Sequence, residues 1–236
     1  MPSQASSRHE RENLITYDID GPVTLDKVFP LKFCINLDRR PARWIAMQES
    51  FAKVGIASVE RLAAVDGKLT TVPEQLSHLR PVDYACTLSH LFAVKKALER
   101  GSPAVLIFED DCLFDPDFVE KFPIFISQVP DDWDMLFLGG YHFEPPVPVS
   151  RNIVRAVMTL TTHAYVVRQR LYSEFIALNE NPPAVVDRNN TLLQQQFNCY
   201  CFEPNLVGQL PGYSDLMEQE MPEKPLAYSL PIRGNW

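Results

Sequence analysis

The chain has 236 residues, a formal net charge of −8, an apolar fraction of 46% and a charged fraction of 22%. This length suits one α/β domain with a modest extension, and the composition is ordinary for a globular protein. The acidic balance excludes a nucleic-acid partner as a first expectation, because such proteins carry a basic face and no run of Lys or Arg here exceeds a pair. A phosphate ligand stays open, since a divalent cation can supply positive charge locally.

The first elements are typical of a nucleotide-binding α/β domain. Residues 1–28 are polar and lack sustained periodicity, which predicts a loose N-terminal arm. An apolar run at residues 31–37 predicts a buried strand. After a charged turn, apolar residues recur at helical spacing between Pro41 and Gly55, which predicts a helix with glycine at its end. Strand, charged turn and helix are the usual opening of such a domain.

The middle of the chain adds two strands and a long helix. The strands are predicted at residues 58–65 and 104–108, and the second is the clearest buried strand in the sequence. The helix between them is predicted at residues 84–100, with Gly101 as its stop. Its broad apolar face is expected to hold Leu88, Leu91, Phe92 and Leu98.

The second half continues the alternation of strands and helices. Strands are predicted at residues 135–138, 153–158, 163–167 and 199–202, the middle two as a pair. Helices are predicted at residues 169–178 and 187–197. Together these elements predict an α/β, Rossmann-type nucleotide-binding fold, in which helices flank a central, mostly parallel sheet.

The organisation of the chain is predicted to be one domain with two loose ends. We find no internal repeat. The domain is expected to span residues 29–216, after the arm at residues 1–28. Residues 217–236 are Pro-rich and polar, so we expect them to form a tail.

The cysteines and the hydropathy pattern bear on the compartment. Five cysteines, an odd number without C-x-x-C spacing, are expected to be buried thiols in a reducing environment. Apolar stretches stay well below the roughly 20 residues that span a bilayer, and the N-terminus has no apolar signal region. We therefore expect a cytoplasmic protein, for which any membrane association is peripheral.

Three consecutive carboxylates follow the clearest strand. Glu109, Asp110 and Asp111 lie directly after residues 104–108. In an open α/β sheet, ligands bind at the carboxyl ends of the strands. Like charges this close repel unless a cation lies between them, and carboxylate oxygens are the ligands that hard divalent ions prefer. The triplet therefore predicts a metal site, against the alternative of a solvated acidic turn.

Several segments then resemble the motifs of glycosyltransferase family 25, which includes bacterial lipooligosaccharide glycosyltransferases and collagen galactosyltransferases. The resemblance runs from about residue 31 to residue 216. The matching segments are Ile35-Asn36-Leu37-Asp38-Arg39-Arg40 with Arg43 and Trp44, Ala63-Ala64-Val65-Asp66-Gly67, Cys86-Thr87-Leu88-Ser89-His90, Leu106-Ile107-Phe108-Glu109-Asp110-Asp111, Ala164-Tyr165-Val166-Val167, and Pro204 to Asp215.

This resemblance implies a GT-A-like fold and a glycosyltransferase. It implies a nucleotide-sugar donor, commonly UDP-linked, with Mn2+ or Mg2+, and inversion at the anomeric carbon. We expect transfer of a hexose, galactose or glucose, to a glycan or glycolipid acceptor, as in the assembly of cell-surface lipopolysaccharide.

Metal and donor roles are assigned by position and resemblance. Asp111 is the first candidate for a metal ligand, with Glu109 and, from the C-terminal loop, Asp215 as further candidates. Asp110 is a catalytic candidate that contacts the ribose or sugar of the donor. The predicted donor-binding residues are Asn36, Arg39, Arg43, Asp66, Ser89, His90 and Asp110. The alternatives are solvated surface arginines, an Asp-Gly turn at Asp66, a packing histidine at His90 and a capping role for Asp215.

Asp187 is the candidate catalytic base. An inverting transfer needs one carboxylate close enough to take the proton of the acceptor hydroxyl. The competing interpretation makes Asp187 the N-cap of a helix at residues 188–197. Two other functions stay open: a metal-dependent phosphohydrolase or nucleotidyltransferase, against which the sequence has no Gly-rich phosphate loop, and a catalytically silent relative that binds sugars.

Overall fold

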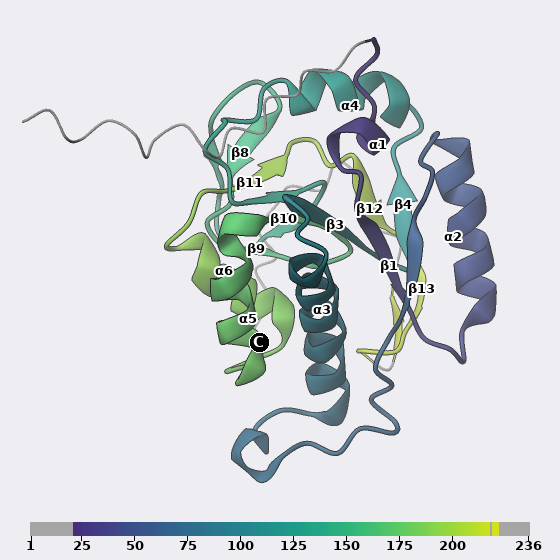
Figure 1. Cartoon of the computed structure of the whole chain (residues 1–236), viewed down its shortest axis with the longest axis vertical. Helices are drawn as coiled ribbons and strands as arrows, with labels where there is room; N and C mark the ends of the chain where they lie inside the picture. Colours follow the sequence, from purple (N-terminus) through teal and green to yellow (C-terminus); the bar gives the residue numbers. More distant parts are fainter. Residues whose placement is uncertain (1–20, 218, 222–236) are drawn as a thin grey trace, which may run out of the picture.

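The computed structural model describes residues 21–217 and 219–221, and a mixed sheet of eight strands runs through this part of the chain (Figure 1). The strands are β1 Lys32–Asn36, β2 Glu60–Ala63, β3 Ala104–Glu109, β5 Met135–Phe137, β7 Val147–Pro148, β8 Ile153–Arg155, β10 Ala164–Arg168 and β11 Cys199–Phe202. Their order is β2-β1-β3-β10-β5-β11-β8-β7. The pairs β2–β1, β1–β3 and β5–β11 are parallel, whereas β10 runs antiparallel to both β3 and β5.

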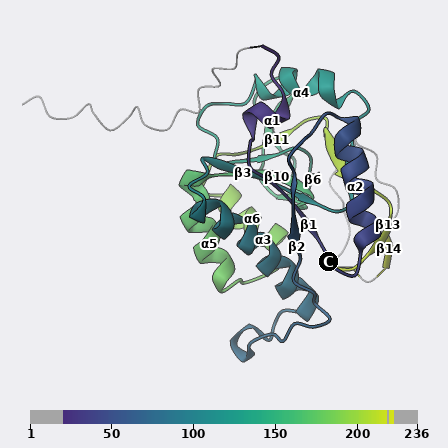
Figure 2. The same ribbon diagram turned by 45° about the vertical axis from the view of Figure 1, so that its right-hand side comes forward.

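Helices cover both faces of this sheet, which confirms the predicted α/β class. The helical segments are α1 Leu25–Val28, α2 Pro41–Lys53, η1 Glu74–Leu76, α3 Pro81–Glu99, α4 Phe118–Ile126, η2 Gln169–Leu171, α5 Tyr172–Glu180 and α6 Val186–Gln194. Figures 1 and 2 show α3, α5 and α6 on one face, with α1, α2 and α4 on the other. Side chains alternate along β1, so Phe33 packs into one core and Cys34 into the other.

Three short two-stranded sheets lie beside the main one within the described residues. They pair β4 Cys112–Phe114 with β12 Val207–Gln209, β6 Tyr141–His142 with β9 Thr159–Leu160, and β13 Gly212–Ser214 with β14 Gln219–Met221. The third pair corrects the predicted boundary after residue 216, because the chain there turns within a hairpin. The remainder of the predicted tail, residues 222–236, lies outside the described residues.

The predicted N-terminal boundary is also too late. Residues 1–20 lie outside the described part, but α1 belongs to the domain because Leu25 and Val28 are buried in the core. The buried ammonium of Lys32 explains this packing. Its Nζ lies 3.1 Å from Asp26 Oδ1 and donates to the backbone oxygens of Phe29 and Pro30. A buried charge requires such partners, so β1 and α1 are held together.

The face that α3 turns to the core differs from the prediction. The helix begins at Pro81 rather than Tyr84, since proline is well suited to the first helical turn. Phe92 and Leu98, predicted to be buried, are 45% and 46% exposed. The side chains that pack on the sheet are smaller and include Ala93, Val94 and Ala97.

Most other elements appear where the sequence predicts them. The strands predicted at residues 153–158 and 163–167 exist as β8 and β10, but they are not neighbours, because β5 and β11 lie between them. The helix predicted at residues 169–178 is divided into η2 and α5. The sequence analysis missed α4, whose apolar face carries three buried phenylalanines.

All five thiols are free, and the predicted burial holds for Cys34, Cys112, Cys199 and Cys201. Cys86 is half-buried. In the part of the chain that the structure describes, no helix has the length and apolar character to cross a membrane.

Candidate active site

The three carboxylates lie where the ends of two parallel strands meet. Glu109 is the last residue of β3, and its register partner in β1 is Ile35, one residue before the end of that strand. Asp110 and Asp111 form the turn that leads into β4. The sequence places them there because a buried apolar strand must end where charged side chains begin.

Glu109 is held by a histidine and a hydroxyl. His90 Nε2 lies 3.3 Å from Glu109 Oε1, and Thr162 Oγ1 donates to the same oxygen at 2.6 Å. Burial raises the pKa of Glu109, but His90 and Thr162 outweigh burial, so its pKa is lowered overall. His90 Nδ1 in turn lies 3.0 Å from the hydroxyl of Tyr165. Glu109 is therefore an ionised, oriented group.

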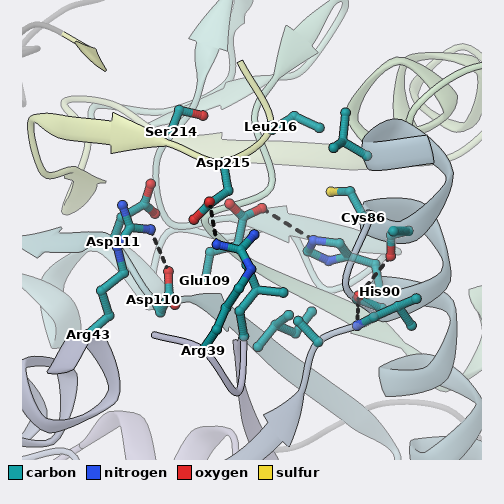
Figure 3. Close-up of a pocket in the computed structure, with 18 residues that line it drawn as sticks. Arg39, Arg43, Cys86, His90, Glu109, Asp110, Asp111, Ser214, Asp215 and Leu216 are labelled. Carbon is teal, nitrogen blue, oxygen red and sulfur yellow. Dashed lines mark hydrogen bonds and ion pairs between the residues drawn. The ribbon is translucent and has the colours of Figure 1, made fainter. Parts of the chain in front are cut away.

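Asp110 is held by two of the predicted donor-binding residues. Asn36 Nδ2 donates to Asp110 Oδ2 at 2.6 Å, and Arg43 Nη1 donates to Asp110 Oδ1 at 3.0 Å (Figure 3). Burial is the main influence on this carboxyl and raises its pKa, although Asn36 and Arg43 oppose the shift. Arg43 also donates to the backbone oxygen of Tyr213, which ties α2 to β13.

Asp111 has the least satisfied carboxylate of the three. Its Oδ1 is buried without a hydrogen-bond partner, and the amide of Gln209 reaches Oδ2 at 3.5 Å. Burial, reinforced by the charges of Glu109 and Asp110, raises the pKa of Asp111 to about 7. A buried oxygen without a partner is costly, so its retention points to a ligand.

A second cluster joins arginines of the β1–α2 turn to acids from distant loops. Arg39 donates from Nε to Asp66 Oδ2 at 2.7 Å and from Nη1 to Asp215 Oδ1 at 2.7 Å (Figure 3). Arg40 Nε donates to the other oxygen of Asp215 at 3.0 Å. Burial works against ionisation of Asp215, but the two guanidinium groups hold its pKa below the usual range. Asp215 is thus an arginine partner in this structure, not a neighbour of Asp111.

Ser89 and Asp66 have clear structural roles. The hydroxyl of Ser89 donates to the backbone oxygen of Ala85 at 2.8 Å and accepts from the backbone N–H of Val65 at 2.9 Å. Asp66 Oδ1 accepts from the backbone N–H of Lys68, so the predicted Asp-Gly turn is present. Gly67 is required there, because a Cβ would lie 2.7 Å from the Cα of Val82.

Two cavities meet at the carboxylates. The first, about 130 Å³, lies between the ends of β1 and β2 and the helix α3, and Arg39, Asp66's neighbour Gly67, Ser89 and His90 line it (Figure 3). The second, about 420 Å³, lies towards the start of α6 and the segment after β12. The residues lining both are Arg43, Cys86, Glu109, Asp110, Asp111, Ser214 and Leu216. The carboxylates therefore face two ligand spaces at once.

Asp187 lines the second cavity together with the triplet. The helix α6 begins at Val186 with Val185 as its N-cap, so the capping interpretation of Asp187 is wrong. Burial is the main cause that raises the pKa of this carboxyl, and Glu109 adds to it. Asp187 is thus brought into the same cavity as the triplet from 76 residues further along the chain than Asp111.

The sequence analysis missed several residues of this site. Thr162 holds Glu109, Arg40 holds Asp215, and Gln209 reaches Asp111. Thr161, which also lines the second cavity, has a φ of 76°, an uncommon conformation for a β-branched residue. No local motif marks these residues, because each is placed by the pairing of distant strands.

The fold and the site define an α/β protein with an acidic, strand-end site of the kind that binds nucleotides. Residues 29–181 match the sequence profile described as Glycosyltransferase family 25 (LPS biosynthesis protein). This is more than half of the chain, which therefore belongs to glycosyltransferase family 25. Asp187 and Asp215 lie beyond the matched residues.

The relatives found by sequence include active and inactive members by name. A "Glycosyltransferase 25 family member" of Drosophila melanogaster is 30% identical over 61% of this chain and 26% of its own length. One of Aedes aegypti is 32% identical over 45% of this chain and 20% of its own length. An "Inactive glycosyltransferase 25 family member 3" of Mus musculus is 29% identical over 55% of this chain and 25% of its own length. The chain thus spans about a quarter of these relatives' length.

Replacing His90 by Asn should destabilise the protein by about 1–3 kcal/mol at pH 7, because the buried carboxylate of Glu109 loses its charged partner. Urea denaturation followed by circular dichroism measures this loss. The matched control is His78→Asn, whose exposed imidazole contacts only the backbone oxygen of Pro183. Equal stability of the two variants would contradict the role of His90.

Proposed function

We propose that the chain is an inverting, metal-dependent glycosyltransferase that moves a hexose from a UDP-sugar to a hydroxyl acceptor. Family membership supports the reaction class. The observation that carries the proposal is the position of the triplet between two cavities, with one buried oxygen of Asp111 lacking a partner. A transferase needs such an arrangement, because the donor and the acceptor must both reach the reacting carbon.

The residues fit a divalent metal that is shared with the substrate. In the described part of the chain, no three His, Cys, Asp or Glu side chains form a closed metal site. Mg2+ and similar ions are commonly bound by one or two carboxylates, with phosphate oxygens and water completing the shell. Asp111 is the residue we propose to hold Mn2+ or Mg2+, with Glu109 behind it. The ion would neutralise the departing diphosphate when bound.

The first cavity is proposed to take the nucleotide. It lies at the carboxyl ends of β1 and β2, where α/β sheets bind such ligands. Arg39 and Arg43 offer guanidinium forks, which suit the oxygens of a diphosphate. Asn36 holds Asp110 so that this carboxylate faces the donor ribose or sugar. Ser89 and His90 support this wall of the cavity through their contacts with Val65 and Glu109.

The second cavity is proposed to take the acceptor, with Asp187 as the base. The carboxylate of Asp187 takes the proton of the acceptor hydroxyl as its oxygen bonds to the anomeric carbon. The bond from that carbon to the diphosphate breaks on the opposite side, so the configuration inverts. The raised pKa of Asp187 suits a group that must accept a proton. The buried free thiols suit a cytoplasmic setting for this reaction, such as lipopolysaccharide assembly.

Incubation with single UDP-sugars and Mn2+, with and without glycan acceptors, tests the proposal. Release of UDP, followed by analysis of the product's anomeric configuration, should give transfer with inversion. Cleavage between the phosphates would instead indicate the phosphohydrolase alternative. Binding of sugars without any release of UDP would indicate a silent relative, as the mouse protein's name describes for that protein.

Replacing Asp215 by Asn should leave the Mn2+ concentration needed for half-maximal UDP binding within about threefold of the unmodified protein. The structural reason is that both carboxylate oxygens of Asp215 accept from Arg39 and Arg40. Titration of Mn2+ at fixed UDP measures this value. A tenfold or larger increase would instead support the sequence-based prediction that Asp215 is a metal ligand.

A further inference from the structure

The second cavity has a charged end and an apolar remainder. The charged end consists of the triplet and Asp187, which the proposed reaction uses. The remaining lining is mostly apolar and consists of Ala46, Met47, Tyr141, Leu160, Val185, Val186, Leu210, Pro211, Tyr213, Leu216, Met217 and Met221, beside a few polar groups such as Thr161 and Gln209. A hexose alone does not need this surface, since sugars are recognised through their hydroxyl groups.

The apolar side chains are open to a ligand and adaptable. Leu210 is 40% exposed and Met217 is 36% exposed, although both line the cavity. Methionine is unbranched and flexible, so it fits ligands of irregular shape. Apolar surface concentrated around an opening, with charged groups at one end, is typical of a site for an amphiphilic ligand.

The charges of the cavity also select the ligand. Four carboxylates line it, from Glu109, Asp110, Asp111 and Asp187. Arg43 is the cation among the described lining residues, and its guanidinium is already paired with Asp110. An anionic group entering beside these carboxylates would be repelled. The cavity therefore favours a neutral head group.

We propose that the acceptor is a neutral glycolipid: a sugar whose hydroxyl meets Asp187 while its aliphatic chain lies against the side chains around Leu210 and Met217. The inference rests on the proposed function and specifies the acceptor class within it. An aliphatic chain is favoured over an aromatic group because aliphatic side chains and methionines dominate the apolar lining.

Equilibrium binding of alkyl glycosides tests this inference without requiring turnover. Octyl and methyl β-D-glucopyranoside, and the matching galactosides, are titrated into the full chain below the concentration at which octyl glycosides form micelles. We expect the octyl compounds to bind at least about tenfold more tightly, because each fully buried methylene adds roughly fourfold to affinity. Octyl β-D-glucuronide should bind about tenfold more weakly than octyl glucoside.

Two variants separate binding in the cavity from detergent adsorption. Leu210→Gln combined with Met217→Gln should abolish the preference for octyl over methyl glycosides. Ile124→Gln, which changes a 56% exposed isoleucine on α4, should preserve it. Equal binding of octyl and methyl compounds, equal loss in both variants, or tighter binding of 4-nitrophenyl glycosides would each overturn the inference. UDP titration of the same samples tests the proposed function separately.

Discussion

Replacing Asp111 by Asn should stabilise the metal-free protein above pH 7 and remove the effect of Mn2+ on donor binding. Burial and two neighbouring carboxylates raise the pKa of Asp111 to about 7, well above its value in an unfolded chain. The folded state therefore keeps a proton that the unfolded state has released. The contribution of Asp111 to stability is full below about pH 4, falls as the pH rises to about 7, and stays lost above it.

The expected gain is about 1–3 kcal/mol at pH 8, since solvent screening reduces the effect of a half-buried group. It should raise the melting temperature by several degrees and should disappear near pH 4. Calorimetric melting across this pH range, without metal, measures it. Glu49→Gln, on the exposed side of α2, is the control and should show no such pH dependence. A variant that is less stable than the unmodified protein at pH 8 would contradict the strain assigned to Asp111.

Replacing Asp187 by Asn should lower the rate of transfer by about 10²–10⁴-fold while leaving UDP affinity within about threefold. The amide cannot take the proton of the acceptor hydroxyl, but Asp187 lines only the second cavity and not the first. Single-turnover transfer and UDP titration measure the two quantities.

Glu174→Gln is a matched control for Asp187→Asn, because it also removes a carboxylate from the first turn of a helix. It should retain full activity. If Asp187→Asn transfers sugar at the normal rate, another group must be the base. If it also loses UDP affinity, Asp187 must act on the donor.

The central strands could be predicted from sequence because their signal is local. A run such as residues 104–108 is apolar on both faces and must be buried, wherever the rest of the chain lies. The packing of α3 could not be predicted in this way. Its exposed side carries Phe92 and Leu98, and the sheet accepts smaller side chains, so hydrophobicity alone gives the wrong face.

The site was predictable to the extent that its residues follow strand ends. Asn36 and Asp110, 74 residues apart, are brought together because β1 and β3 are parallel neighbours. The partners of Asp215 were not predictable, since they depend on how β13 crosses the β1–α2 turn. Thr162 and Gln209 carry no distinctive motif, and their contacts arise from the pairing of β10 with β3 and of β12 with β4.

The most direct measurement is calorimetric titration of the protein with UDP and UDP-sugars, with and without Mn2+, repeated on Asp111→Asn. We predict that Mn2+ strengthens UDP binding to the unmodified protein at least about tenfold, and that this effect is lost in the variant. Because a proton competes for Asp111, the effect should also weaken below pH 7. UDP binding that is the same with and without Mn2+, or equally metal-dependent in the variant, would contradict a metal-assisted transferase centred on Asp111.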